Sequence, residues 1–281
     1  MSAPGTVSFS LRRIGVIAEL TVLEAVRQRL FGVLLVLAAG MIAGAQLLRE
    51  FNFGSSELKF ITDFGFGAVT LFGTILAVVT AAQLFFAEIE NRTALTLLAK
   101  PVFRAEFVLG KFAGVAAVLA LFVGVTTGVL VAVLWMREQS LMASVPEAFE
   151  RGRLVQYGSV VAFGALQWLK FSVIAALTLV IAGFANTNLY SVVISFLVVL
   201  ICHLQYLAHE SWRRMASGVG RTAAMLLAAV FPNFQMFNVG DRVAAGQAID
   251  PVVLGGSAAY GALYLAVFLA LAVYVFRRRE I

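Results

Sequence analysis

Charged side chains are scarce in this sequence, and their scarcity excludes an ordinary water-soluble domain. Only 13% of the 281 residues are Asp, Glu, Lys or Arg, whereas 61% are hydrophobic, and the mean hydropathy is +0.95. A typical soluble domain carries about 25% charged residues. The composition therefore indicates an integral membrane protein.

Reactive groups are also few. The single cysteine, Cys202, excludes an internal disulfide, and two histidines offer few ligands to a transition metal. The motifs GxxxxGK[ST], HExxH, CxxC and GxSxG are missing, so we expect no ATP site, no metal and no cofactor on this chain. Because no apolar run holds a convincing acid, base or nucleophile, an intramembrane enzyme is disfavoured as well.

The sequence contains long apolar runs instead of such reactive groups. A helix needs about 20 apolar residues to cross the roughly 30 Å hydrocarbon core. The runs predict six transmembrane helices, at residues 30–48, 64–87, 112–136, 160–184, 189–207 and 252–276. No repeat or linker separates a second domain, so we predict one all-α membrane domain over residues 1–281.

The distribution of charge predicts the orientation. With six spans both termini lie on one side, and the segments on that side hold more Lys and Arg than acids, whereas the opposite segments hold equal numbers. Cytoplasmic segments normally carry the basic excess, which places both termini in the cytoplasm. The net charge of +6 then reflects orientation and contact with anionic membrane lipids, and not nucleic-acid binding.

The N-terminal segment is charged and mixed, which indicates that it is not a cleavable signal peptide. Residues 9–29 place apolar side chains at three-and-four spacing. This pattern predicts an amphipathic helix in the membrane interface ahead of the first span. A plain cytoplasmic extension of that span is the alternative.

Two ionisable side chains lie inside predicted spans. A charge such as Lys170 at the bilayer centre costs about 2.5–3.5 kcal/mol on insertion scales, so such residues snorkel, pair or line a pathway. All three roles stay open for Lys170. His203 is expected to be packed or hydrogen-bonded within the helix bundle.

Residues 222–239 carry no charge but are interrupted by Pro232 and Asn233. The apolar part before Pro232 is too short to cross a bilayer, and proline breaks helical hydrogen bonding. We predict a re-entrant hairpin on the outer side, before the last span; a loop with an apolar face is the alternative.

The charged segment Glu88–Lys111 separates the second and third spans. Its first part, to Ala99, favours a short cytoplasmic helix, with Glu88 and Glu90 near the N-terminal end, where the helix dipole favours negative charge. Pro101 biases Lys100 away from helical geometry and ends that helix. Such a helix suits the transmission of force from a soluble partner, or it lies at the lipid headgroups.

The same segment resembles the cytoplasmic segment of ABC-2-type permeases, the membrane subunits of bacterial ATP-binding-cassette exporters. The resemblance rests on Glu88-Ile-Glu-Asn-Arg-Thr, Leu97-Leu-Ala-Lys-Pro-Val, Arg104 and Phe107-Val-Leu-Gly-Lys111, in that order. Further matches are Trp168-Leu-Lys170, the stretch from Pro232 to Asn238, and Phe276-Arg-Arg-Arg-Glu280.

The resemblance implies a function and a set of partners. Permeases of this kind pair as homodimers or with a related chain in the bacterial cytoplasmic membrane, and each docks a separate cytoplasmic ATPase that carries ATP and Mg²⁺. Residues 9–29 would be the connecting helix, residues 88–104 the coupling segment and residues 222–239 the outer re-entrant element. The coupling residues would be Glu88, Glu90, Asn91, Arg92, Thr93, Lys100, Pro101 and Arg104. The positions with a pathway or structural role would be Lys170, His203, Pro232, Asn233 and Phe234.

Two functions follow from these expectations. The first is the permease of an ATP-driven exporter. The alternative is a non-transporting membrane scaffold or assembly factor that docks a cytoplasmic partner. No substrate-specific signature is present, so the sequence leaves the cargo open.

Overall fold

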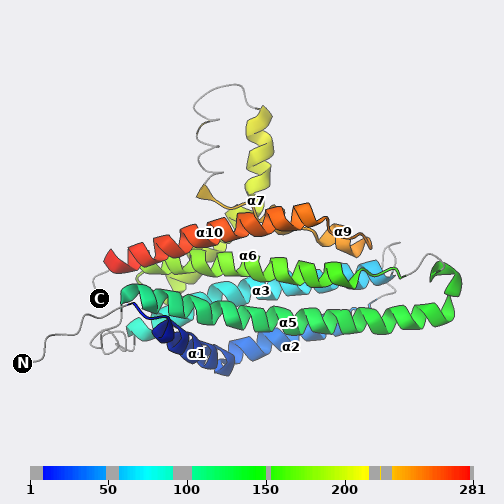
Figure 1. The fold of residues 1–281 in the computed structure, drawn as a ribbon, viewed down its shortest axis with the longest axis horizontal. Coiled ribbons are helices and arrows are strands. Elements are labelled where there is room, and N and C mark those ends of the chain that lie inside the picture. Colours follow the sequence, from blue (N-terminus) through cyan, green and yellow to red (C-terminus); the bar gives the residue numbers. More distant parts are fainter. Residues whose placement is uncertain are drawn as a thin grey trace, which may run out of the picture.

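The computed structural model describes residues 9–48, 57–90, 103–149, 153–214, 222 and 230–278. Every regular element within them is helical, which confirms the all-α prediction (Figure 1). The longer helices are α1 (Leu11–Arg27), α2 (Arg29–Gly44), α3 (Glu57–Glu90), α5 (Arg104–Ser144), α6 (Tyr157–Phe184), α7 (Asn188–Arg214) and α10 (Pro251–Arg278). The short elements are α9 (Gly240–Ala244) and the 3₁₀ helices η2 (Pro146–Phe149) and η3 (Phe234–Phe237).

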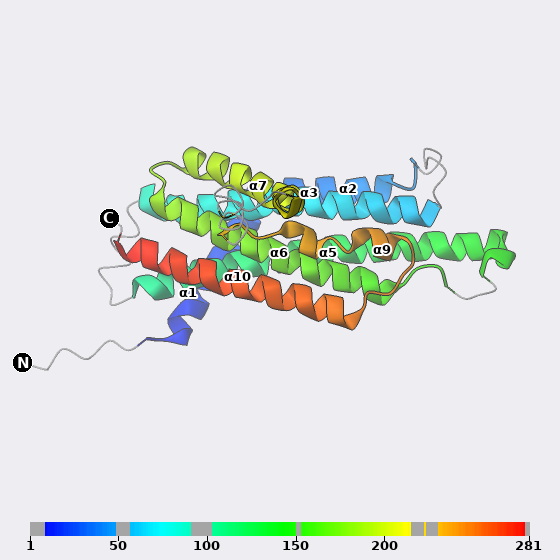
Figure 2. The same ribbon diagram turned by 90° about the horizontal axis from the view of Figure 1, so that it is seen from above.

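The helices form an elongated bundle around α6. This helix contacts α3, α5, α7 and α10, and α3, α5, α6 and α10 run side by side in both views (Figures 1 and 2). The C-terminal turns of α7 leave the bundle and stand out from it in Figure 1. Among the described residues, α3, α5, α6, α7 and α10 are long and apolar enough to cross a membrane, and α1 with α2 gives a sixth span if the bent pair is counted as one.

Proline placement explains why the helices are so long. The sequence has only five prolines, and α5 runs for 41 residues, about 61 Å, without one. It ends at Ser144, because Pro146 disfavours helical geometry at Val145. Pro251 occupies the first position of α10, where its missing N–H costs nothing, and the Asp250 carboxylate accepts a hydrogen bond from the Val252 N–H at 2.8 Å.

The N-terminal helix is separate from the first span. The chain breaks at Gln28, and α1 and α2 meet at an angle of 65°. The bend gives α1 a direction of its own, as expected for a helix that lies apart from the first span. One side of α1 buries Thr21 and Ala25, while Val16 and Leu20 are exposed on another, as expected for an amphipathic helix at a membrane surface.

Two glycines let α1 lie against α5. A Cβ atom on Gly110 would come within 2.7 Å of the Ile17 Cβ, and one on Gly114 within 2.4 Å of the Thr21 Cβ and 2.8 Å of the Ala18 carbonyl oxygen. Glycine at both positions therefore permits the close approach of the two backbones.

Both ends of the described chain lie at the same end of the bundle. The start of α1, the end of α3, the start of α5 and the end of α10 gather there (Figures 1 and 2). The end of α2, the start of α3, the end of α5 and the start of α6 lie at the opposite end. A chain that crosses a membrane an even number of times begins and ends on the same side, and the described chain has this arrangement.

The segment before the last span enters the bundle. η3 contacts α6 and α7, and the Ser257 hydroxyl of α10 donates to the Met236 carbonyl at 2.7 Å. Non-helical backbone at this depth is tolerated in a membrane only where protein or water satisfies it. Residues 223–229, which belong to the predicted re-entrant hairpin, lie outside the described residues, so the hairpin stays a prediction.

Candidate coupling end and buried interior site

The predicted coupling segment is only partly described. The backbone of α3 continues through Glu88 and Glu90, so these two residues end α3 and do not begin a separate helix. No proline precedes them in the α3 sequence, and the helix therefore runs on past the predicted end of the second span at residue 87. Asn91, Arg92, Thr93, Lys100 and Pro101 lie outside the described residues.

Arg104 is described, and it joins two helices. It is the first residue of α5, and its guanidinium donates to the Arg277 carbonyl oxygen in the last turn of α10 at 2.7 Å. A cation at this position also complements the negative end of the α10 dipole. The contact fixes the position where the chain leaves the coupling segment.

A buried carboxylate fixes α1 to the same end. Glu106 has no exposed surface, and its oxygens accept hydrogen bonds from the Ser10 N–H at 2.6 Å and the Phe103 N–H at 3.1 Å. The Arg13 guanidinium donates to both oxygens, from Nε at 2.9 Å and from a terminal nitrogen at 2.7 Å. Bidentate pairing and two backbone donors thus hold the first turn of α1 against the first turn of α5.

Aromatic rings connect the remaining helices there. The Phe276 ring of α10 lies 5.5 Å from that of Phe85 in α3 and 5.3 Å from that of Phe107 in α5, measured between centroids. On the other side of α5, the buried Lys111 ammonium lies 3.5 Å from the Glu24 carboxylate of α1. The helices that flank residues 91–102 are therefore held in a packed framework.

Lys170 occupies the interior of the bundle. It lies near the middle of α6, about 20 Å from either end at 1.5 Å per residue, and only 4% of it is exposed. Its ammonium lies 5.7 Å from the centroid of the Phe234 ring. This burial disfavours snorkelling, one of the three roles left open, because the side chain lies far along the helix from the first residue of α6, Tyr157.

His203 and the segment around Pro232 complete this interior cluster. The His203 Nδ1 lies 2.8 Å from the Val199 carbonyl, and its ring packs edge-on against Phe234 at 5.2 Å between centroids, as the packed, hydrogen-bonded role requires. Pro232 is buried beside them, and the Asn233 N–H donates to the Tyr260 hydroxyl at 2.7 Å. The structure thus brings Lys170, His203 and Phe234 together and places Pro232 and Asn233 next to them.

Buried polar side chains that the sequence analysis did not single out lie on α7 and α6. Asn188, Ser191 and Ser195 of α7 each bury an oxygen without a hydrogen-bond partner among the described residues, and so does Gln167 of α6. Such groups are costly in a low-dielectric interior, and at functional sites they often await a ligand or water. On α7, Asn188, Ser191 and Ser195 are spaced three and four residues apart, and this spacing is the sequence pattern from which a polar face could have been predicted.

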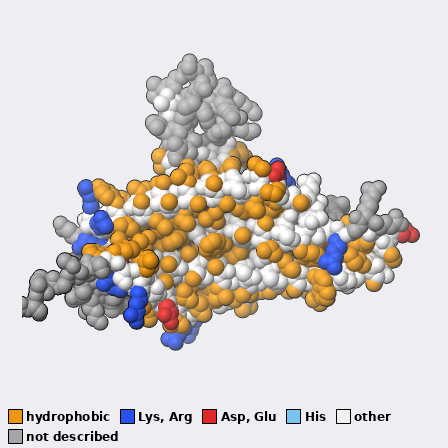
Figure 3. Space-filling model, in the orientation of Figure 1, with side chains coloured by type: hydrophobic (Ala, Val, Ile, Leu, Met, Phe, Trp, Pro, Cys, Tyr) orange, Lys and Arg blue, Asp and Glu red, His pale blue; other side chains and the backbone are white. Residues whose placement is uncertain are grey.

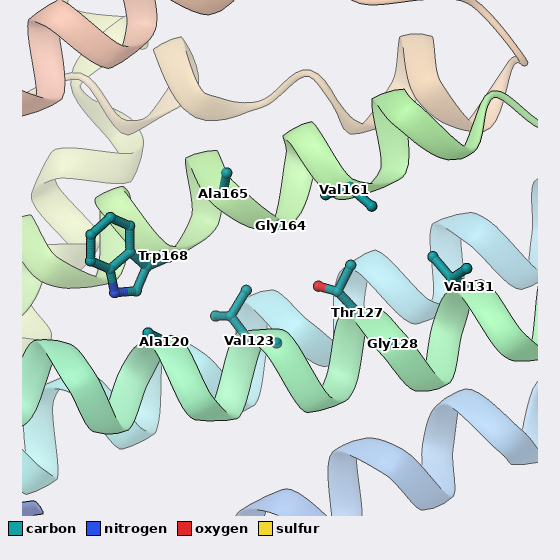
Figure 4. A pocket seen from close by; sticks show the side chains of 10 residues that line it. Ala120, Val123, Thr127, Gly128, Val131, Val161, Gly164, Ala165 and Trp168 are labelled. Carbon is teal, nitrogen blue, oxygen red and sulfur yellow. The ribbon is translucent and has the colours of Figure 1, made fainter.

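An apolar groove of about 420 Å³ separates α5 from α6 (Figure 4). Gly124 and Gly128 form its floor on α5, and a Cβ on either glycine would meet nothing within 4 Å. Trp168 lines one end of the groove, and its indole N–H donates to the Ala116 carbonyl at 2.9 Å. Figure 4 shows the side chains of Val123, Thr127 and Val131 along α5, across from α6.

The opposite end of the bundle holds a second buried carboxylate that sequence reasoning missed. Glu138 accepts hydrogen bonds from the N–H groups of Leu154 and Val155 at 3.0 and 3.2 Å and from the Tyr157 hydroxyl at 2.6 Å. Nearby, the Arg137 guanidinium pairs with Glu57 and joins α5 to α3. Of Glu106 and Glu138, only Glu106 could have been found from a local sequence pattern. It stands three residues after Phe103, the N-cap position of α5, and a glutamate there often accepts from the N-cap N–H.

Comparison with known proteins identifies the family to which this chain belongs. The sequence model described as "ABC-2 family transporter protein" matches residues 24–203, which is more than half of the chain. A search of curated proteins found no match. The matched region runs from the end of α1 into α7 and contains the coupling segment, Lys170 and His203. With its helices long enough to span a membrane and this match, the chain is a multi-pass membrane protein that belongs to the ABC-2 transporter family.

Proposed function

We propose that this chain is the permease subunit of an ATP-driven exporter in a bacterial cytoplasmic membrane, working as a pair of permeases with a separate ATPase. The family match over residues 24–203 carries the proposal, because ABC-2 permeases partner with an ATP-binding-cassette subunit. In this reading both termini and residues 88–104 face the cytoplasm. The coupling residues are Glu88, Glu90, Asn91, Arg92, Thr93, Lys100, Pro101 and Arg104, and ATP and Mg²⁺ bind the partner.

The packed framework at this end supports a coupling role. Force applied to residues 91–102 reaches α3 through Glu90 and α5 through Phe103. From α5 it passes to α1 through Glu106 and to α10 through Arg104. A partner that moves this segment therefore moves four helices together.

The interior cluster supports a pathway role. A lysine at mid-membrane depth without a carboxylate partner among the described residues is costly, and such residues usually serve transport. Lys170, His203, Pro232, Asn233 and Phe234 would line or gate the pathway, and the unpartnered oxygens of Asn188, Ser191 and Ser195 lie farther along α7.

The test is purification of the tagged chain in mild detergent, followed by reconstitution with the ATPase that co-purifies. We expect a Walker-motif ATPase to co-purify, and replacement of residues 88–92 by alanines to abolish transport-coupled ATP hydrolysis. The matched control replaces Glu147 and Arg153, charges at the opposite end, and leaves coupling intact.

Normal assembly and coupling after replacement of residues 88–92 would contradict the coupling role. ATPase binding without any efflux from reconstituted vesicles would instead favour the scaffold function.

A further inference from the structure

A second groove lies between α5 and α10, at the end of the bundle where the described chain begins and ends. Its volume is about 460 Å³. Ala105 and Leu109 line it on α5, and Ala266, Ala270 and Val273 line it on α10. These side chains are small or aliphatic, so the groove is an apolar channel along the helix axes.

The α10 wall of the groove has about the length of one leaflet, whereas the α5 wall runs only from Ala105 to Leu109, about 6 Å. Its α10 wall runs from Ala266 to Arg277, which is about 16 Å at 1.5 Å per residue. Half of a hydrocarbon core of roughly 30 Å is about 15 Å. A transmembrane helix of a partner would need a groove through both leaflets, whereas one acyl chain needs only this length.

The mouth of the groove is cationic. Arg277 lines it, and the Arg278 guanidinium lies 4.7 Å from the centroid of the Tyr274 ring, which also lines the groove. Arg104 holds the Arg277 carbonyl, so a third guanidinium lies at the same place. Figure 3 shows Lys and Arg side chains gathered at this end of the bundle beside an apolar flank.

The carboxylate of Glu106 does not neutralise the mouth. Glu106 follows Arg104 in the first turn of α5, but its oxygens are occupied by Arg13 and by the N–H groups of Ser10 and Phe103. Guanidinium groups bind phosphate oxygens in bidentate fashion, and aromatic rings favour the headgroup level of a bilayer.

We propose that this groove binds an anionic phospholipid, with its phosphate on Arg277 and Arg278 and one acyl chain between α5 and α10. The charge selects the headgroup, and the length of the groove selects a chain from one leaflet. Basic pockets between transmembrane helices bind anionic headgroups in this way. The bound lipid would bridge α5 and α10 beside the Arg104 contact and hold this end of the bundle together.

The test uses the purified full chain in detergent, with phosphatidylglycerol and phosphatidylcholine of identical acyl chains as probes. We expect native mass spectrometry to retain phosphatidylglycerol at least tenfold better, and this lipid alone to raise the Tm. The double substitution Arg277→Gln and Arg278→Gln removes that preference. Arg153→Gln, which removes a charge at the opposite end, keeps it.

A second variant tests the acyl-chain part. Ala270→Leu fills the groove and is expected to weaken phosphatidylglycerol binding about tenfold while the lipid-free Tm stays unchanged. Ala262→Leu, an exposed alanine of α10 that does not line the groove, is the control.

Three outcomes would overturn the proposal. Equal retention of both lipids would show ordinary annular lipid. Displacement of phosphatidylglycerol by equimolar inorganic phosphate would show an anion site without a chain site. Loss of a dimer in Ala270→Leu, with lipid binding intact, would assign the groove to a second copy of the chain.

Discussion

Buried charges in this bundle are stabilised in different ways. Glu106 and Glu138 each receive several hydrogen bonds and hold the start of a neighbouring helix or loop. Lys170 has the face of the Phe234 ring but no carboxylate partner among the described residues. A satisfied carboxylate stabilises a fold, whereas a charge with so little compensation is retained for another reason. A substitution of Lys170 is therefore expected to affect function much more than the stability of the fold.

We expect Lys170→Met to abolish transport-coupled ATP hydrolysis in vesicles while the free energy of unfolding changes by no more than about 1.5 kcal/mol. The loss of a cation–π contact, worth about 2 kcal/mol when desolvated, is offset by removal of a charge that costs about 2.5–3.5 kcal/mol at mid-bilayer. Lys170→Arg keeps the charge and should retain part of the activity. Full transport by Lys170→Met would show that the lysine is not a pathway residue, and failure of this variant to fold would assign the lysine a structural role.

At the scale of helices, glycine spacing has two different consequences in α5. Gly110 and Gly114 face α1 at contact distance, whereas Gly124 and Gly128 open into the groove beside α6. Both pairs show the same Gly-x-x-x-Gly pattern, so the sequence alone did not distinguish them. Only the bend at Gln28, which folds α1 back against α5, gives the first pair its partner.

Gly114→Ala should destabilise the protein by about 1–3 kcal/mol, the usual cost of overpacking, because the new methyl group meets the Thr21 side chain and the Ala18 backbone. Gly128→Ala on the same helix should be neutral or stabilising by up to about 1 kcal/mol, since alanine favours a helix more than glycine does. Unfolding of both variants in mixed detergent micelles measures the difference. Equal stabilities would mean that α1 does not pack on α5.

The sequence predicted the helices that hydrophobicity defines and missed contacts between distant residues. Each long apolar run corresponds to a helix, because a bilayer demands length and apolarity that composition reveals directly. The pairing of Glu106 with Arg13 joins two helices far apart in sequence, and no local pattern encodes it. Lys170 and His203 were identified singly, but their meeting at Phe234 depends on the path of residues 230–239 through the bundle.

The described part of the molecule has two chemically different ends, and their difference predicts its orientation. The end where the described chain begins and ends combines the start of α1, Arg104, Lys111 and the arginines in the last turn of α10. Acidic and basic side chains are mixed at the other end, where Glu57 pairs with Arg137. Because basic segments favour the cytoplasmic side, the end with the termini should face inward.

Cysteine labelling tests that orientation. Cys202 is buried, so Cys202→Ser gives a background without thiols, into which Ser10→Cys and Ser144→Cys are introduced separately. Ser10 precedes α1 and Ser144 ends α5, at opposite ends of the bundle. We expect a membrane-impermeant maleimide to label Ser144→Cys in intact spheroplasts and Ser10→Cys only in inverted vesicles. Labelling of both positions from one side would mean that α5 does not cross the membrane, and the reverse pattern would place the coupling segment outside, where no ATPase could reach it.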